Sequence, residues 1–144
     1  MFGEAVLTVV ESLFDIGCYE VSLGDTIGVG TITGTHRLMK AVSRIVSVDS
    51  VAVHFHDTYG QALPNILTAL EHGETVIDSS IGGLGGCPYA KGASGNVATE
   101  DVIYMLAGMG IHTGISLDAL VETSIFVADY LGKPPISRVS AALM

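Results

Sequence analysis

Three short, partly apolar runs with strand character constrain the fold of this chain most strongly, because a segment with helical character follows each one. The runs cover residues 18–23, 50–55 and 75–79, and the helical segments cover residues 34–46, 61–72 and the stretch that begins at residue 99. Two more helices, over residues 4–16 and 117–131, flank the series. Strands that alternate with helices form parallel sheets with right-handed crossovers. We therefore predict an α/β fold.

Single residues predict where these helices begin and end. Gly17 and Gly73 are typical stop signals, and Gly132 closes the last helix ahead of two prolines. Thr99 and Ser116 are predicted N-caps, since their hydroxyls can accept a backbone N–H. These short, polar boundaries leave no room for a linker, so the 144 residues read as one domain.

Charge and length exclude several classes of function. Fifteen acidic residues against six basic ones give a formal net charge of −9, which disfavours binding to nucleic acid or to an anionic membrane. No apolar run reaches the roughly 18–20 residues that span a bilayer. The first residues contain no basic segment, so we expect no signal peptide. Cys18 and Cys87 form no CxxC pattern, which favours a reducing compartment.

Two histidines at the end of the second apolar run form the sharpest local pattern. His54 and His56 are two residues apart, so on a strand both imidazoles project from the same face. Such a pair, with Asp57 beside it, suits two ligands of one divalent metal. The alternative is a structural pair that is hydrogen-bonded at a strand end. Two other histidines, His36 and His72, belong to helices and are expected to face solvent.

Further oxygen donors can complete a metal site at the same edge of the sheet. Asp25 follows the first strand, and Asn96 follows the third. Ligands of parallel sheets sit beyond the carboxyl ends of the strands, which is where both residues fall. Nitrogen and oxygen ligands without thiolates suit Mg²⁺, Mn²⁺ or Zn²⁺. The simpler alternatives are a turn aspartate and a helix-capping asparagine.

A glycine-rich segment carries the second cysteine. Four glycines occur within residues 82–86, and Cys87 follows them directly. Glycines at this density permit positive φ angles and a close approach of the backbone to a ligand. A thiol in such a loop can act as an acid, a base or a nucleophile when its pKa is lowered. The alternative is an incidental free thiol.

These motifs together resemble those of the hydroxymethylglutaryl-CoA lyases. The matching stretches are Ser22–Gly30 (SLGDTIGVG), His54–Gln61 (HFHDTYGQ), Ile77–Ser80 (IDSS), Gly83–Ala90 (GLGGCPYA) and Gly92–Asn96 (GASGN). The glycine and cysteine segment is the most specific of them. The HxHD pattern alone recurs across metal-dependent TIM-barrel lyases and Claisen-type synthases.

The resemblance implies a (β/α)₈ TIM barrel that uses a divalent cation, Mg²⁺ or Mn²⁺, to cleave 3-hydroxy-3-methylglutaryl-CoA into acetyl-CoA and acetoacetate. That reaction belongs to leucine degradation and ketone-body formation. The residues with implied roles are His54, His56 and Asn96 as metal ligands, Asp25, Cys87 and His54 as catalytic groups, and Gly83, Gly85, Gly86 and Tyr89 in the substrate loop. The complete enzyme is expected to be a homo-oligomer that binds acyl-CoA in the cytoplasm of a bacterium or the mitochondrial matrix of a eukaryote.

The resemblance reaches only the C-terminal half of the family, its last three strand–helix units and the closing helices. A (β/α)₈ barrel needs about 200–250 residues or more, and residues 1–144 are expected to be the C-terminal part of such a domain. The family's first-strand Arg-Asp pair has no counterpart, since no arginine precedes an aspartate in the sequence. We therefore expect little activity without the N-terminal half-barrel. The alternatives are a non-enzymatic metal-binding or interaction module and an aldolase or synthase of the same superfamily.

Overall fold

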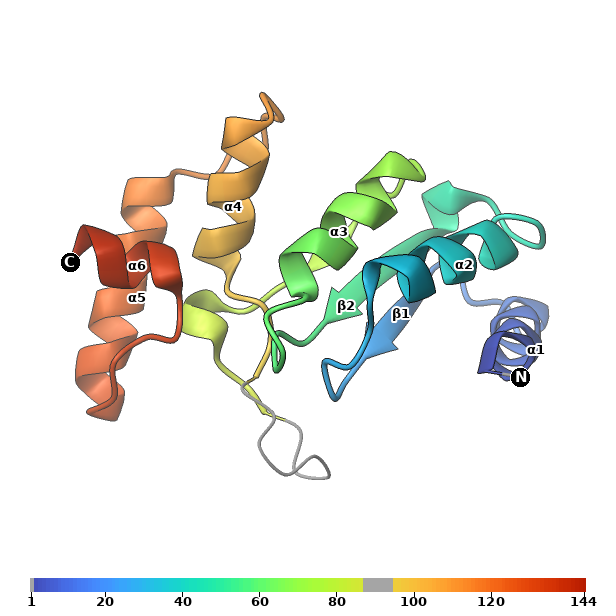
Figure 1. Cartoon of the computed structure of the whole chain (residues 1–144), viewed down its shortest axis with the longest axis horizontal. Helices are drawn as coiled ribbons and strands as arrows, with labels where there is room; N and C mark the ends of the chain where they lie inside the picture. Colours follow the sequence, from blue (N-terminus) through green and yellow to red (C-terminus); the bar gives the residue numbers. More distant parts are fainter. Residues whose placement is uncertain (1, 87–94) are drawn as a thin grey trace.

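The computed structural model describes residues 2–86 and 95–144. Along the chain its elements are α1 (Phe2–Asp15), β1 (Val21–Asp25), α2 (Ile32–Val42), η1 (Val48–Ser50), β2 (Val51–Phe55), α3 (Ala62–Glu71), β3 (Ile77–Asp78), η2 (Ile81–Gly83), α4 (Thr99–Gly108), α5 (Leu117–Leu131) and α6 (Arg138–Leu143). The helices α1 and α6 lie at opposite ends of the molecule (Figure 1). None of the helices in the described ranges combines the length and the apolar character needed to cross a membrane.

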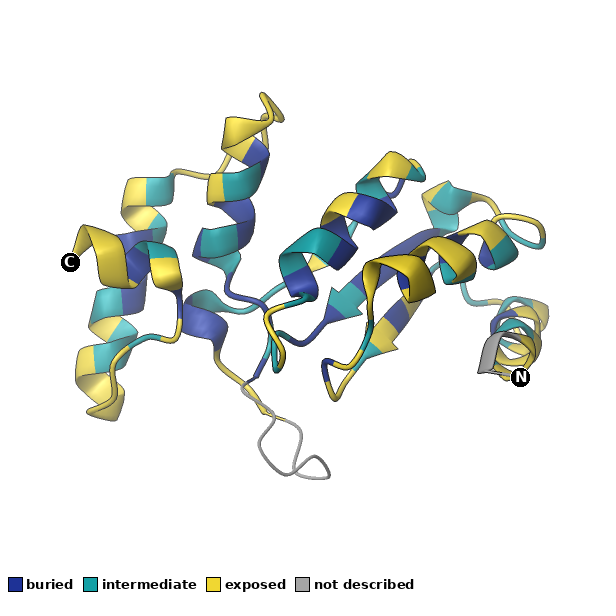
Figure 2. Ribbon diagram, viewed as in Figure 1, coloured by how far each residue is buried: buried dark blue, intermediate teal, exposed yellow. Residues whose placement is uncertain are grey.

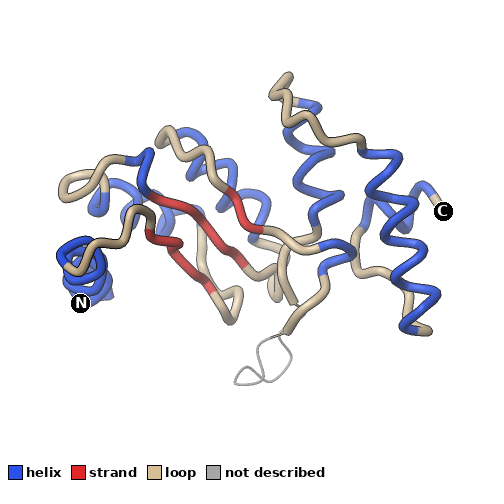
Figure 3. The backbone as a smooth tube through the Cα atoms, turned by 180° about the vertical axis from the view of Figure 1, so that it is seen from behind, coloured by secondary structure: helices blue, strands red, loops and turns tan. Residues whose placement is uncertain are grey.

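The three strands form one parallel sheet in the order β1-β2-β3, which confirms the predicted α/β class (Figure 3). The crossovers α2 and α3 lie together on one side of this sheet (Figure 1). Since all three strands point the same way, their carboxyl ends meet at one edge, beyond which ligands bind in such folds.

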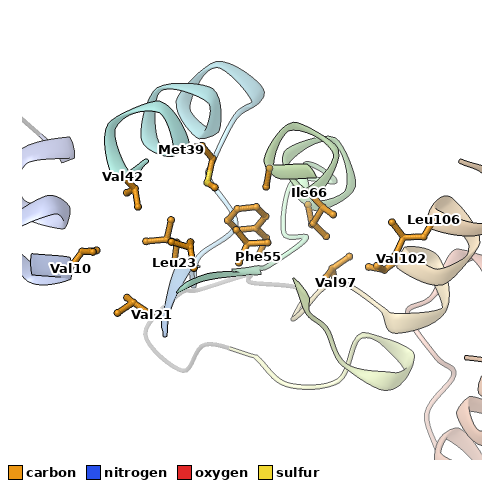
Figure 4. Close-up of a cluster of buried hydrophobic side chains, with 14 residues drawn as sticks. Val10, Val21, Leu23, Met39, Val42, Phe55, Ile66, Val97, Val102 and Leu106 are labelled. Carbon is orange, nitrogen blue, oxygen red and sulfur yellow. The ribbon is translucent and has the colours of Figure 1, made fainter. Parts of the chain in front are cut away.

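Much of the core lies between the sheet and these two helices, and Val10 of α1 and Leu106 of α4 extend it at either end (Figure 4). Alternate residues of β1, Val21 and Leu23, are buried, and Met39 of α2 and Ile66 of α3 pack in the same cluster with Phe55. Burying each such side chain contributes about 1.5–3 kcal/mol. Burial is concentrated on the strands and on the inward faces of the helices, while the outward faces are exposed (Figure 2).

The first strand begins three residues later than predicted. Gly17 has a φ of 98°, and the N–H of Cys18 donates to the carbonyl of Leu13, so these residues finish α1. Cys18 is half-buried and packs against the core as a small apolar residue. The strand starts only at Val21.

The third strand is also shorter than the predicted range of residues 75–79. The backbone N–H groups of Thr75 and Val76 both donate to Glu74 Oε1 at 2.8 Å. Two donors are thereby diverted from the sheet, and only Ile77 and Asp78 form the strand. A local side-chain acceptor competes here with the ladder.

The predicted cap of α4 is wrong. Ala98 occupies the N-cap position without a side-chain bond, because the hydroxyl of Thr99 lies 2.9 Å from that of Ser79. The other predicted cap is confirmed, since Ser116 accepts the N–H of Ala119 at the start of α5. Helix α2 also differs from its prediction, running from Ile32 to Val42 rather than over residues 34–46.

Candidate functional site

The sheet register brings polar residues of all three strands to one edge. Gly24 lies opposite His54, and His54 lies opposite Asp78. Ser22 points to the same face as Gly24, because strand residues alternate between faces. This face is partly open, with Ser22 and Asp78 exposed and His54 half-buried. The edge predicted from the sequence is therefore formed.

The two histidines lie side by side, as the HxH spacing predicts. The ring centroids of His54 and His56 are 5.5 Å apart, and the ring planes are inclined by 51°. His54 Nδ1 is 3.6 Å from Asp78 Oδ2, an ion-pair separation rather than a hydrogen bond. Ser22 Oγ donates to the same carboxylate oxygen at 3.0 Å.

Asp78 and Ser22 are neighbours of His54 that the motifs alone did not identify as site residues. The signal was present in the strand pattern. Asp78 ends the third apolar run, and Ser22 lies in the first run on the face that β1 leaves exposed. Only the register shows that both carboxylate contacts converge on one oxygen of Asp78.

His56 is placed for metal binding in its neutral form. It is 6% exposed, and its backbone N–H donates to the carbonyl of Asp25. Burial lowers the pKa of His56 below its ordinary value, the charge of His54 lowers it further, and Asp25 partly opposes both. Its Nδ1 is buried with no hydrogen-bond partner in the described part of the chain. A neutral imidazole with a free ring nitrogen can bind a metal.

Asn96 reaches His56 through a short antiparallel bridge. Its Nδ2 donates to the carbonyl of Leu84 at 2.9 Å. That contact leaves Oδ1 as the available acceptor, and this oxygen is likewise buried without a partner among the described residues. Buried polar atoms are nearly always hydrogen-bonded, so an unpartnered ring nitrogen and an unpartnered amide oxygen on bridged residues fit the role of cation ligands.

The ligand set is incomplete in the described ranges. His54, His56 and Asn96 supply two imidazoles and one amide oxygen. Within residues 2–86 and 95–144, no three His, Cys, Asp or Glu side chains converge as a metal-holding group. Mixed nitrogen and oxygen donors suit Mg²⁺ or Mn²⁺, which take further ligands from other oxygens or from water.

The glycine segment packs its backbone directly on Asn96. Gly83 and Gly85 have φ angles of 70° and 92°, as glycine allows. A Cβ on Gly85 would lie 2.7 Å from Asn96 Nδ2. Gly86 has no described atom within 4 Å of such a position. The predicted site residues Cys87 and Tyr89 lie outside the described residues.

Asp25 closes the turn that follows β1. Its Oδ2 accepts the N–H of Gly30 at 2.7 Å, and its Oδ1 accepts that of Val29 at 3.2 Å. Asp25 is therefore a turn aspartate, which was the simpler alternative from the sequence. The same carboxylate is close enough to His56 to raise the pKa of that imidazole.

Asp57, next to the histidines, holds the start of α3 through a hydrogen bond. Its Oδ1 accepts the N–H of Ala62 at 2.8 Å at the beginning of α3. Asp57 and Asn96 also line a cavity of about 470 Å³, whose wall includes Arg138 and Tyr59. A guanidinium in that wall can bind a carboxylate or a phosphate.

Comparisons with known proteins place this geometry in context. The sequence profile of the HMGL-like family matches residues 3–127. Hydroxymethylglutaryl-CoA lyase, mitochondrial, of Arabidopsis thaliana is 56% identical over 96% of this chain and 30% of its own length. The cytoplasmic 3-hydroxy-3-methylglutaryl-CoA lyase of Homo sapiens is 53% identical over 96% of this chain and 38% of its own.

Solved structures agree with these matches. The hydroxymethylglutaryl-CoA lyase of Pseudomonas aeruginosa has a TM-score of 0.92 and 56% identity, covering 96% of this chain and 46% of that one. An HMG-CoA lyase of Acinetobacter baumannii, in complex with coenzyme A and 3-methylmalate, has a TM-score of 0.90 and 39% identity, covering 95% and 45%. The chain thus spans less than half the length of these relatives. Its fold corresponds to part of their barrel.

Proposed function

The chain belongs to the HMGL-like family, and from this membership we propose that it carries one part of the active site of a hydroxymethylglutaryl-CoA lyase. The reaction is the metal-dependent cleavage of 3-hydroxy-3-methylglutaryl-CoA into acetyl-CoA and acetoacetate. The proposal rests on one observation. At the end of β2, His54 lies beside His56, and His56 is bridged to Asn96. The buried Nδ1 of His56 and Oδ1 of Asn96 have no hydrogen-bond partner among the described residues.

These three residues would hold the cation, Mg²⁺ or Mn²⁺. When bound, a divalent cation supplies Lewis-acid polarisation of the substrate's hydroxyl and carboxylate oxygens. His56 is prepared for this role because burial lowers its pKa and so keeps the imidazole neutral. Asn96 is held by its contact with Leu84, which orients the amide oxygen as an acceptor.

Two side chains would move the protons. Asp25 accepts the proton of the substrate's C3 hydroxyl, through Oδ1, which is held less tightly than Oδ2. The C2–C3 bond then breaks, its electron pair enters the acetyl-CoA enolate, and acetoacetate forms. The thiol of Cys87 donates a proton to the enolate carbon. The proton taken up by Asp25 then returns through solvent to the Cys87 thiolate, so both groups are restored. Gly83, Gly85, Gly86 and Tyr89 would contact the substrate.

The cavity beside Asn96 would admit the acyl-CoA. Its volume of about 470 Å³ lies within the range of small-molecule sites. Its wall holds the guanidinium of Arg138 beside the carboxylates of Asp57 and Asp101, and that guanidinium can bind an anionic group of an acyl-CoA. His54, paired with Asp78, faces the same sheet edge and orients the substrate's polar end.

Three parallel strands do not close a (β/α)₈ barrel, so activity requires the missing strands of an N-terminal half-barrel. The complete protein is a homo-oligomer. The protein would lie in the cytoplasm if its source is a bacterium and in the mitochondrial matrix if its source is a eukaryote. The second candidate function is a metal-binding module without catalysis, which the pairing of His54 and His56 supports by itself.

A fusion experiment tests the proposal. We expect the chain alone to bind Mn²⁺ but to form no acetoacetate, and a fusion to the N-terminal half of the Pseudomonas aeruginosa lyase to cleave the substrate. In the fusion, Cys87→Ala should abolish cleavage and retain Mn²⁺, whereas His56→Ala should remove both. His112→Ala, at an exposed position, is the matched control and should retain both Mn²⁺ binding and cleavage.

The outcomes separate the two candidates. Cleavage at enzyme-like rates by the chain alone contradicts the need for a second half. A folded fusion that binds Mn²⁺ but releases no acetoacetate supports the non-enzymatic module. Loss of Mn²⁺ binding in His112→Ala, but not in His56→Ala, places the metal elsewhere and overturns the site.

A further inference from the structure

A second pair of histidines lies away from the candidate active site. His36 is an exposed residue of α2, and His72 is the half-buried C-cap of α3. The two helices pack side by side on the sheet (Figure 1). Helix α3 has 10 residues and starts just after the loop of His56, so its length of roughly 15 Å separates His72 from that loop.

The two imidazoles are in direct contact. His72 Nε2 lies 3.0 Å from His36 Nδ1, and the ring centroids are 4.7 Å apart with an interplanar angle of 63°. One ring N–H therefore donates a hydrogen bond to the nitrogen of the other ring. Two imidazole nitrogens on a tetrahedral zinc ion lie roughly 3.3 Å apart. Small rotations of these two side chains would therefore allow both nitrogens to bind one zinc ion.

We propose that His36 Nδ1 and His72 Nε2 bind one Zn²⁺ ion in a site separate from the candidate active site. Neutral imidazole is a preferred ligand of zinc and of copper, and a pair of imidazoles without a protein oxygen suits Zn²⁺ better than Mg²⁺. The net charge of −9 favours any bound cation. No further His, Cys, Asp or Glu joins the pair in the described ranges, so water completes the coordination.

The bound ion would link the two crossover helices. Helices α2 and α3 touch each other and jointly cover the sheet. A ligand that binds only the folded chain stabilises it by mass action. Zinc at this pair should therefore raise the thermal midpoint, and it does so whether or not the chain takes part in lyase chemistry.

Calorimetric titration with zinc sulfate tests the site. To remove the candidate active-site ligands, we use a background that carries His54→Ala and His56→Ala. We expect this background to bind one Zn²⁺ per chain. His36→Gln and His72→Gln should each weaken binding at least tenfold, and His112→Gln, which changes a histidine of an exposed loop, should leave it unchanged.

The proposal is overturned if the background binds no zinc, or if His36→Gln and His72→Gln bind it as tightly as the background. A second measurement avoids the double substitution. Zinc should raise the thermal midpoint of the unmodified chain and of His112→Gln more than that of His72→Gln. An equal rise in all three contradicts the site. Magnesium sulfate at the same concentration should produce no difference among them.

Discussion

Glu100 binds the backbone N–H of Gly82 through both of its carboxylate oxygens, each at 3.0 Å. The side chain is 0% exposed, and its Oε1 also accepts the hydroxyl of Ser140 at 3.2 Å. One buried carboxylate thus joins three elements, because Gly82 lies in η2, Glu100 begins α4 and Ser140 belongs to α6. The residues that follow Gly82 are those that pack on Asn96.

Replacing this carboxylate should weaken the fold. Glu100→Gln keeps one acceptor oxygen but turns an NH₂ group toward Gly82 or Ser140. Hydrogen bonds to charged groups contribute about 1.5–3 kcal/mol, so we expect a loss of about 1–3 kcal/mol in the free energy of unfolding, measured in urea. The exposed residue Glu122 offers a matched control, and Glu122→Gln should change stability by less than about 0.5 kcal/mol. Equal stabilities for the two variants would contradict this role of Glu100.

Two neighbouring glycines should respond differently to alanine. Gly85→Ala places a Cβ 2.7 Å from Asn96 Nδ2 at a φ of 92°, a conformation that costs an L-residue about 1–2 kcal/mol. Gly86→Ala meets no described atom within 4 Å. We expect Gly85→Ala to displace Asn96 and to weaken Mn²⁺ binding at least tenfold, as followed by electron paramagnetic resonance. Gly86→Ala should keep the unmodified affinity, and a similar loss in both variants would refute steric support of Asn96.

The pKa of His56 should fall further when Asp25 loses its charge. Burial and the charge of His54 hold this pKa below its ordinary value, and Asp25 acts in the opposite direction. The stability that neutral His56 contributes is full above the ordinary histidine pKa of about 6.5 and is lost as pH falls below it. Asp25→Asn should lower the pKa seen in an NMR titration of the ring protons, and Asp118→Asn should not. A rise in Asp25→Asn would show that the carboxylate acts other than by its charge.

Glu74 should make the chain less stable as pH rises. Burial raises the pKa of this carboxyl, and the backbone N–H groups of Val76 and Thr75 only partly oppose it. Its contribution to stability is greatest below the ordinary glutamate pKa of about 4.3 and is lost as pH rises through the raised value. Glu74→Gln should therefore melt higher than the unmodified chain at pH 7.5, with roughly 4 °C for each kcal/mol relieved.

The same comparison near pH 4 serves as the internal control for Glu74. There the carboxyl is mostly protonated in both states, so the advantage of Glu74→Gln should be much smaller. Glu11→Gln, at an exposed position of α1, should melt like the unmodified chain at both values. An advantage for Glu74→Gln that is independent of pH would point to packing rather than to charge.

Periodicity sufficed to predict the sheet and most helices, since β2 and α5 depend on local apolar spacing and on the cap of Ser116. The prediction failed where a side chain forms a hydrogen bond in place of one expected in the sheet or at a helix cap. Glu74 shortens β3, and Ser79 takes the hydroxyl of Thr99 that would have capped α4. The short helix α6 was not predicted. Its N-cap Ser137 accepts the N–H of Ser140 locally, but the hydroxyl of Ser137 is held by Asp101, 36 residues away in the sequence.

The candidate site was likewise predictable only where local spacing determines it. The HxH spacing alone predicts that His54 and His56 lie side by side, and their ring separation confirms it. The contact of His54 with Asp78 depends on strand register, which a single strand does not encode. The roles assigned to His54, His56 and Asn96 in metal binding remain predictions for the fusion experiment.

Asp57 links the histidine edge to two other parts of the chain. Its backbone N–H donates to the carbonyl of Gly95, beside Asn96, while its carboxylate fixes the first turn of α3 through Ala62. A single inserted residue between His56 and Ala62 would break one of these two contacts. We therefore expect homologous chains to keep a constant length across this connection and to accept insertions in the exposed turn between α4 and α5 instead.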